Sequence, residues 1–497
     1  MPTSTAALLL YAPLLVTGVV LVWRRPVRAL YAFVVGLALH NALMAALFAA
    51  GVEDSALTAI QAWKEVLLVT AAASVALGAA RARRLPFRPV LVDLLALAFG
   101  MLVAAYALVP QSVLGGEAGG EAVLLALRSA LVPVAAYGIG RSLGLGADDL
   151  RRLAWTLLGT AAVVAALGIV DLLTLSVEWW RDARVPDYFR EELGFTYRGP
   201  GGMPENFAFN SADGLFRRLI STFLSPLASA YAFAVALLLL AAGGPLRRPL
   251  ALALGALTAV ALLLTLSRST IVALAAGLVV LALARRRAWP LAAAAATLVA
   301  GVAFASVFTS VAPETHFFPE EIAYQEEQAR LKGGLPAGEG TLSLAEPSIR
   351  SHLRSLREDA GQVIGHPQGF GLGNAGAVAR RTDEKLLAGE SNLTEIGIQV
   401  GLGGFALFVL WSLALLVGLL RMARRGSPTS WAAAGVAASL AAVLTLSVQT
   451  DAVGVPWLAF CLWWLGGALV APTADSGRAP AAARGVRGRE ATTLQAE

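Results

Sequence analysis

This chain of 497 residues is 57% hydrophobic and only 14% charged, which excludes a water-soluble globular domain, because such domains are about one-quarter charged. The apolar runs are long and unbroken, so spanning helices are favoured over a β-barrel, whose strands alternate. The net charge of +6 indicates cytoplasmic loops and contacts with anionic membrane lipids and argues against a nucleic-acid partner. The one cysteine, Cys461, lies in an apolar run and excludes an intrachain disulfide.

Apolar runs of about 20 residues predict an all-α integral membrane protein with about 12–13 transmembrane helices. The runs lie near 5–23, 29–51, 57–80, 89–110, 121–143, 152–176, 218–243, 248–266, 269–285, 289–311, 392–420, 430–449 and 453–472. Two long polar segments interrupt them, and the second contains amphipathic patterns such as SIRSHLRSLREDAGQVI. Loops of this length are usually functional.

These runs and loops divide the chain into successive regions. The predicted regions are N-terminal transmembrane helices over 1–176, a first external loop over 177–217, transmembrane helices with membrane-edge arginines over 218–311, a large external helical loop over 312–391, C-terminal transmembrane helices over 392–472 and a disordered cytoplasmic tail over 473–497.

Basic residues predict the orientation of the helices. Arginines follow every odd-numbered run, whereas the short loops after even-numbered runs, such as GVEDSA, carry none. Cytoplasmic loops are enriched in arginine and lysine. We therefore expect the N-terminus outside and the C-terminus in the cytoplasm.

Five basic residues lie near the predicted outer ends of the runs, where the positive-inside pattern does not explain them. They are Lys64, Arg128, Arg217, Arg218 and Arg268. Arg268 could simply extend to the interface or form a salt bridge, and Glu65 could neutralise Lys64. Several cations at one depth repel one another unless an anion joins them. Because guanidinium groups bind phosphate oxygens without a metal, the sequence predicts an outward-facing site for a lipid diphosphate.

A second group of motifs closes the large loop. GHPQGFGLGNAGAV covers 365–378, and its glycines allow a tight backbone turn next to a substrate. No strand precedes them, so dinucleotide binding is rejected. GESNLTE then leads into the next apolar run, where Glu390 or Ser391 could cap the helix and Glu390 could also act as a general base. The histidines have no metal-ligand spacing, so we expect no metal.

The order of these motifs resembles the O-antigen ligase and O-antigen polymerase superfamily over roughly 210–420. The matching features are Arg218, Ser221, Phe223 and Pro226, then Ser267-Arg268-Ser269, an arginine-bearing loop helix (Arg350 or Arg354), HPQGFGLG, and ESNLTEIGIQVGLGG, which contains Asn392.

The resemblance implies a GT-C-like, metal-independent glycosyltransferase without a cofactor. Such an enzyme transfers a glycan from an undecaprenyl-diphosphate carrier to a hydroxyl acceptor on the outer, periplasmic side of the bacterial inner membrane. By resemblance, Arg218 and Arg268 bind the diphosphate, Arg350 or Arg354 and Asn392 support the loop, and a base removes the acceptor proton. Similar systems work with a flippase and a chain-length regulator.

One departure from the family pattern leaves alternatives open. Ligases carry a histidine where this sequence has GESN, so Glu390 replaces it, His366 does its work, or the chemistry does not depend on it. Polymerase and ligase therefore both remain open. The alternative functions are a transporter of a small anion and a relative of the cell-wall glycan polymerases.

Overall fold

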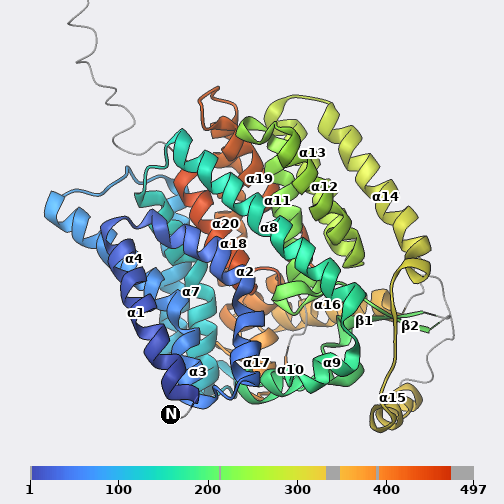
Figure 1. The fold of residues 1–497 in the computed structure, drawn as a ribbon. Helices are drawn as coiled ribbons and strands as arrows, with labels where there is room; N and C mark the ends of the chain where they lie inside the picture. Colours follow the sequence, from blue (N-terminus) through green and yellow to red (C-terminus); the bar gives the residue numbers. More distant parts are fainter. Residues whose placement is uncertain (1–2, 212–213, 332–346, 388–390, 472–497) are drawn as a thin grey trace, which may run out of the picture.

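The computed structural model describes residues 3–211, 214–331, 347–387 and 391–471, which form a bundle of apolar helices (Figure 1). Within these residues, nine helices are long and apolar enough to cross a membrane. They are α1 (Thr3–Arg24), α2 (Val27–Ala49), α4 (Trp63–Ala82), α5 (Leu91–Leu108), α7 (Gly120–Ser142), α8 (Ala147–Thr174), α13 (Arg268–Arg285), α14 (Trp289–Val311) and α18 (Asn392–Ala423).

Shorter apolar helices occupy the remaining predicted runs. They are α11 (Pro226–Ala242), α12 (Pro249–Leu264), α19 (Ser430–Leu446) and α20 (Pro456–Leu469). Each apolar run predicted from the sequence thus contains a helix, and the chain is a helical, multi-pass membrane protein. Helix α1 presents Leu10 and Leu14 outward, as a lipid-facing helix does.

The helices pack closely where small residues meet. A Cβ on Gly140 of α7 would lie 2.0 Å from the Trp464 carbonyl oxygen of α20, and one on Gly467 would lie 2.2 Å from the Tyr137 oxygen. Small residues at such crossings let two helix backbones approach within the membrane. Helices α7 and α20 therefore form a tight central pair.

Two predicted runs differ from the structure at their starts. The run at 57–80 is divided at Ala62 into α3 (Asp54–Gln61) and α4. The run predicted from 218 becomes helical only at Pro226, because Ser225 caps α11 by accepting a hydrogen bond from the Ala228 amide and proline suits the first helical position. The expectation that Arg217 and Arg218 enter the membrane on this helix was therefore wrong.

The segment before α11 forms part of a small antiparallel sheet, which the all-α prediction missed. Strands β1 (Ala208–Ser211), β2 (Gly214–Arg217) and β3 (Glu314–Thr315) pair in that order. Phe216 faces Phe209 on one side and Glu314 on the other. The sheet joins the two polar segments to each other.

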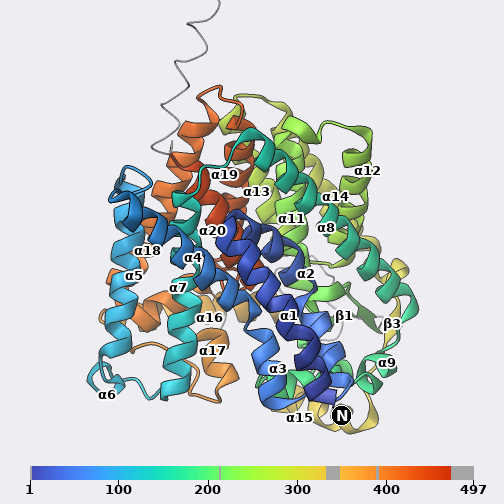
Figure 2. The same cartoon turned by 60° about the vertical axis from the view of Figure 1, so that its left-hand side comes forward.

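Short elements of the polar segments gather at the end of the bundle that holds the N-terminus (Figures 1 and 2). They are α6 (Gln111–Leu114), α9 (Val177–Asp182), α10 (Val185–Asp187), the π-helix η1 (Tyr188–Glu192), α15 (Pro319–Leu331), α16 (Pro347–Gly365) and α17 (Gly376–Arg381). Of the 3-10 turns, η5 (Gly244–Leu246) follows α11 at the opposite end, whereas η2 (Pro200–Gly202), η3 (Glu205–Phe207) and η4 (Ser221–Phe223) precede α11 at the end that holds the N-terminus. This end is the one predicted to face outward.

Candidate functional site

A cavity of about 330 Å³ opens among α2, α4, α5, α7, α17, α18 and the turn before α20. We call it the Lys64 cavity. Its polar and charged lining residues are His40, Asn41, Gln61, Lys64, Arg128, Ser129, Tyr188, Arg381, Asn392, Glu395, Gln399 and Asp451. Both views place α17 beside α7, so the polar loop contributes directly to this cavity (Figures 1 and 2).

Lys64 is held at the first turn of α4, directly after the break at Ala62. Its Nζ donates a hydrogen bond to the Gln61 carbonyl oxygen at 2.8 Å and lies 3.3 Å from His40 Nε2. The Glu65 carboxylate is 3.8 Å away. Lys64 is only 8% exposed, so this cation is fixed inside the protein and does not extend to the interface.

Two arginines from different elements share the cavity with Lys64. Arg128 Nη1 of α7 lies 3.7 Å from Glu65 Oε1, and its side chain is 45% exposed. Arg381 ends α17, and burial lowers the pKa of its guanidinium, with the charge of Arg128 acting in the same direction. Lys64, Arg128 and Arg381 thus lie near one another, with Glu65 beside the first two, and an anion in the cavity would reduce the repulsion between their charges.

Two buried donors in the lining also lack a partner. Gln61 Nε2 and Tyr188 Oη are buried without a hydrogen bond to any residue that the structure describes. Burial raises the pKa of Tyr188, which keeps its hydroxyl protonated and able to donate. Because a buried unsatisfied donor is destabilising by about 1–3 kcal/mol, these groups fit a ligand rich in acceptor oxygens.

The start of α18 brings two carboxylates to the same cavity. Ser391 caps the helix by accepting from the Thr394 amide, as one of the sequence alternatives predicted. Asn392 donates through Nδ2 to Asp451 Oδ1 and accepts from the Val453 amide at 2.7 Å. One turn further, Glu395 Oε1 accepts from Gln399 Nε2 at 3.0 Å. Asn392 therefore positions Asp451, and Glu395 lies beside them.

Arg218 and Arg268 lie together at the turn between α12 and α13. Arg218 Nε donates to the Thr265 carbonyl oxygen at 2.8 Å, three residues before Arg268 begins α13. Tyr231 lies close to both Arg218 and Asp451. This turn therefore adjoins the Lys64 cavity, although neither arginine lines it.

Arg217 has internal partners. Its Nη2 donates to Asp171 Oδ1 at 2.9 Å, its Nη1 donates to the Leu175 carbonyl oxygen, and its guanidinium lies over the Phe207 ring. The side chain is only 1% exposed. Arg217 is therefore not part of the diphosphate site predicted from the sequence. Its ion pair with Asp171 instead holds the segment before α11 against α8.

The glycine-rich turn contacts a break in α18. Val400 (φ −122°, ψ 17°) and Gly401 (φ 71°, ψ −178°) interrupt the helix. The turn supplies hydrogen bonds to the interrupted backbone, from the Phe370 amide to the Ile398 oxygen at 2.7 Å and from the Leu402 amide to the Pro367 oxygen at 2.9 Å. The glycines therefore allow the backbone of this turn to lie close to α18. The sequence had predicted that they would bring the turn close to a substrate.

The same turn is also held by hydrogen bonds to the segment that leads from α6 into α7. Asn374 Nδ2 donates to Gln111 Oε1 at 2.8 Å, and its Oδ1 accepts from the amides of Glu117 and Ala118. A Cβ on Gly373 would lie 2.8 Å from the Ala122 backbone. The polar loop is thus a fixed wall of the cavity in this region.

The other predicted loop residues do not line the cavity or cannot be placed. His366 stacks on Phe370 with ring centroids 4.1 Å apart and is not a lining residue. Arg354 is exposed on α16. Arg350 lies on the same helix, but its side chain is outside the described part of the chain, as is the whole of Glu390.

Several lining residues were not predicted from the sequence. Arg381 and Tyr188 come from polar segments with no motif around them, Glu395 ends the GESNLTE motif but was given no role, and Asp451 lies in no motif. A carboxylate within an apolar run, as at Glu395, is a signal that could have been used. The structure brings Lys64 and Arg128, which the sequence predicted for the diphosphate site, into one cavity with Asn392, which the resemblance implied as support for the loop.

No group of three or more histidine, cysteine, aspartate or glutamate side chains with metal-binding geometry occurs in the described ranges. Comparison with models of known protein families gives no match, and comparison with curated proteins gives none. The family resemblance therefore rests on the short motifs alone.

Proposed function

We propose that this protein is a membrane glycosyltransferase of the O-antigen polymerase or ligase type. It takes a glycan from an undecaprenyl-diphosphate donor and transfers it to a hydroxyl acceptor at the outer face of the bacterial inner membrane. The observation that carries this proposal is the Lys64 cavity, in which three cations and two unpartnered donors face one enclosed space at the end of the bundle.

The cations would bind and stabilise the leaving diphosphate. Lys64, Arg128 and Arg381 offer charge-assisted hydrogen bonds to its oxygens, and the resemblance assigns the same role to Arg218 and Arg268 at the adjoining turn. Because negative charge grows on the diphosphate as the sugar–oxygen bond breaks, fixed positive groups stabilise the transition state more than the ground state.

A carboxylate would take the proton of the acceptor. The acceptor oxygen attacks the anomeric carbon, the bond from that carbon to the diphosphate oxygen breaks, and the proton passes to the base. Glu390 is the first candidate for this role, because it stands about where the family carries a histidine and precedes the cavity residue Asn392 by two positions. Glu395 and Asp451 are the carboxylates that line the cavity and are the alternatives, whereas His366 is not a lining residue.

The proposal is tested by replacing Arg381 and Arg268 separately with glutamine in the native host. Arg357→Gln, an exposed arginine of the large loop to which no role is assigned, is the matched control. After membrane expression is confirmed, surface and lipid-linked glycans are separated on gels. Accumulation of short lipid-linked units indicates a polymerase, and polymer that stays on its carrier indicates a ligase. A normal glycan profile for both variants would contradict the proposal.

The break in α18 favours transport of a small anion as a second candidate. Broken helices beside a binding site are common in transporters, and Gln399 and Val400 line the cavity. However, Phe99 packs on Phe408 and Trp411 with centroids 5.5 and 6.0 Å apart and closes the inner side of the cavity. Anion uptake into proteoliposomes that Arg381→Gln abolishes, together with normal glycans, would support transport.

A further inference from the structure

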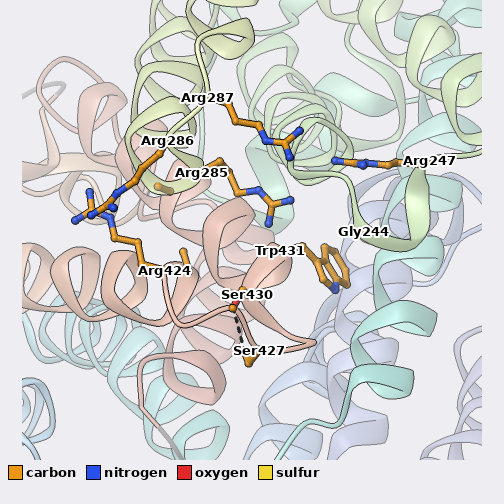
Figure 3. Close-up of a pocket in the computed structure, with 12 residues that line it drawn as sticks. Gly244, Arg247, Arg285, Arg286, Arg287, Arg424, Ser427, Ser430 and Trp431 are labelled. Carbon is orange, nitrogen blue, oxygen red and sulfur yellow. Dashed lines mark hydrogen bonds between the residues drawn. The ribbon is translucent and has the colours of Figure 1, made fainter.

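A second charged pocket lies at the opposite end of the bundle, where α11, α13 and α18 end (Figure 3). It has a volume of about 580 Å³, and we call it the arginine pocket. Its lining residues are Gly244, Arg247, Ala284, Arg285, Arg286, Arg287, Ala423, Arg424, Gly426, Ser427, Ser430 and Trp431. The diphosphate site does not include any of them.

The arginines converge from three helix ends. Figure 3 shows Arg285, Arg287 and Arg247 directed toward one space beside Trp431, while Arg286 and Arg424 extend toward each other. Arg247 and Arg287 are close enough for their charges to act on Arg285. No acidic side chain lines the pocket within the described ranges, so these like charges repel without compensation from the lining.

Local backbone geometry creates this concentration of charge. Arg286 takes a left-handed conformation (φ 51°) that ends α13 between Arg285 and Arg287. On the facing segment, Gly243 and Gly244 also have positive φ values, and a Cβ on Gly244 would lie 2.5 Å from the Trp431 ring. The indole therefore packs directly on the glycine turn and forms one wall of the pocket.

The surroundings of the pocket are those of a membrane boundary. Trp289 follows the arginines and is 47% exposed, and tryptophan is enriched at the level of lipid headgroups. Helix α14, which starts there, presents Leu291, Val299 and Val302 outward, so this apolar face is free to contact acyl chains. Ser427 and Ser430, whose hydroxyls are 3.1 Å apart, add further polar contacts on the pocket wall.

We propose that the arginine pocket binds the phosphate group of an anionic phospholipid from the cytoplasmic leaflet. Guanidinium groups bind phosphate oxygens in pairs, and basic pockets between the cytoplasmic ends of transmembrane helices suit such headgroups. The acyl chains would lie along the exposed apolar face of α14. This assignment is independent of the proposed glycosyl transfer, since it concerns the other end of the molecule.

The test titrates delipidated full-length protein with phosphatidylglycerol and counts bound lipids by native mass spectrometry. The variant is Arg247→Gln/Arg285→Gln/Arg287→Gln, and the matched control is Arg24→Gln/Arg25→Gln/Arg28→Gln, which removes the same number of exposed arginines outside the pocket. We expect one retained lipid in the wild type and the control and at least about tenfold weaker binding in the triple variant. The single variant Arg247→Gln provides a milder change if the triple variant does not fold.

Two comparisons make the result decisive. Equal binding of phosphatidylcholine, or unchanged phosphatidylglycerol binding in the folded variants, would overturn the proposal. Inorganic pyrophosphate distinguishes the source of the phosphate, because a lipid site binds phosphatidylglycerol more tightly. If pyrophosphate binds more tightly and the variants lose it, the pocket is a site for a soluble phosphate compound and the lipid assignment fails.

Discussion

Arg217 and Arg218 are adjacent in the chain but have different surroundings. Arg217 ends β2 and its guanidinium is enclosed with Asp171, whereas Arg218 points the other way and binds the Thr265 carbonyl oxygen. Successive side chains of an extended segment point to opposite faces, so a strand separates two neighbouring arginines that a helix would have kept on similar faces. Arg217 thus stabilises the fold through an internal ion pair, whereas Arg218 is bound at the turn between α12 and α13.

The buried hydroxyl of Tyr188 leads to a second prediction about a single residue. The Tyr188→Phe variant should fold with unchanged or higher thermal stability, because it removes a buried hydroxyl that has no described partner. The same change should lower glycan product by up to about tenfold if that hydroxyl donates to substrate. Thermal unfolding in detergent and gel analysis of glycans measure the two effects.

Tyr137→Phe is the control for this variant, because the Tyr137 hydroxyl donates to Asp93 Oδ1 at 2.6 Å at the far end of α7. It should lower thermal stability by about 1–3 kcal/mol and leave glycan product per folded molecule unchanged. Strong destabilisation by Tyr188→Phe with normal product would show that the Tyr188 hydroxyl has an internal partner instead.

At the scale of elements, the broken helix α18 and the glycine-rich turn depend on each other. The turn supplies the hydrogen bonds that the break leaves open, and both elements meet at Gly369 and Gly401, where a Cβ on Gly369 would lie 2.5 Å from the Gly401 amide nitrogen. Both glycines have positive φ values of 74° and 71°. The loop is therefore fixed to the membrane helix at the level of the cavity.

Gly401→Ala should disrupt this junction. Its Cβ would lie 2.4 Å from the Pro367 carbonyl oxygen, and alanine is strained at this φ. We expect faster proteolysis of the 365–376 turn and loss of glycan product. Gly403→Ala on the same helix has nothing within 4 Å of its Cβ and should behave as the wild type. Equal behaviour of the two variants would mean that the junction is not important for the site.

The sequence predicted the apolar helices but not the break in α18 or the small sheet, and this difference has physical reasons. Long apolar runs mark helices because lipid leaves the backbone no other partner, so each run contains a helix, although only nine helices in the described residues are long and apolar enough to cross a membrane. The break at Val400 and Gly401 lies inside an apolar run, where hydropathy cannot reveal it. The pairing of β2 with β3 joins residues about a hundred positions apart, and Asp171, the partner of Arg217, lies 46 positions away in sequence, so no local pattern predicts either contact.

At the scale of the whole molecule, charge is distributed between two ends with different chemistry. The Lys64 cavity combines its cations with carboxylates and unpartnered donors, as catalysis on a sugar diphosphate would need. The arginine pocket has cations with no described acid in its lining, as a simple anion site would. The positive-inside rule predicts that the first faces outward and the second faces the cytoplasm.

The buried cysteine makes this orientation measurable. Cys461 is only 1% exposed, so the wild-type protein should not react with a maleimide that cannot cross membranes. Glu117→Cys introduces a thiol at a side chain that is 72% exposed beside the Lys64 cavity end, and Arg425→Cys introduces one at an exposed position near the arginine pocket. Glu117→Cys should be labelled in intact spheroplasts and Arg425→Cys only after lysis. The reverse pattern would place the Lys64 cavity in the cytoplasm, where no glycan carried to the outer face could reach it.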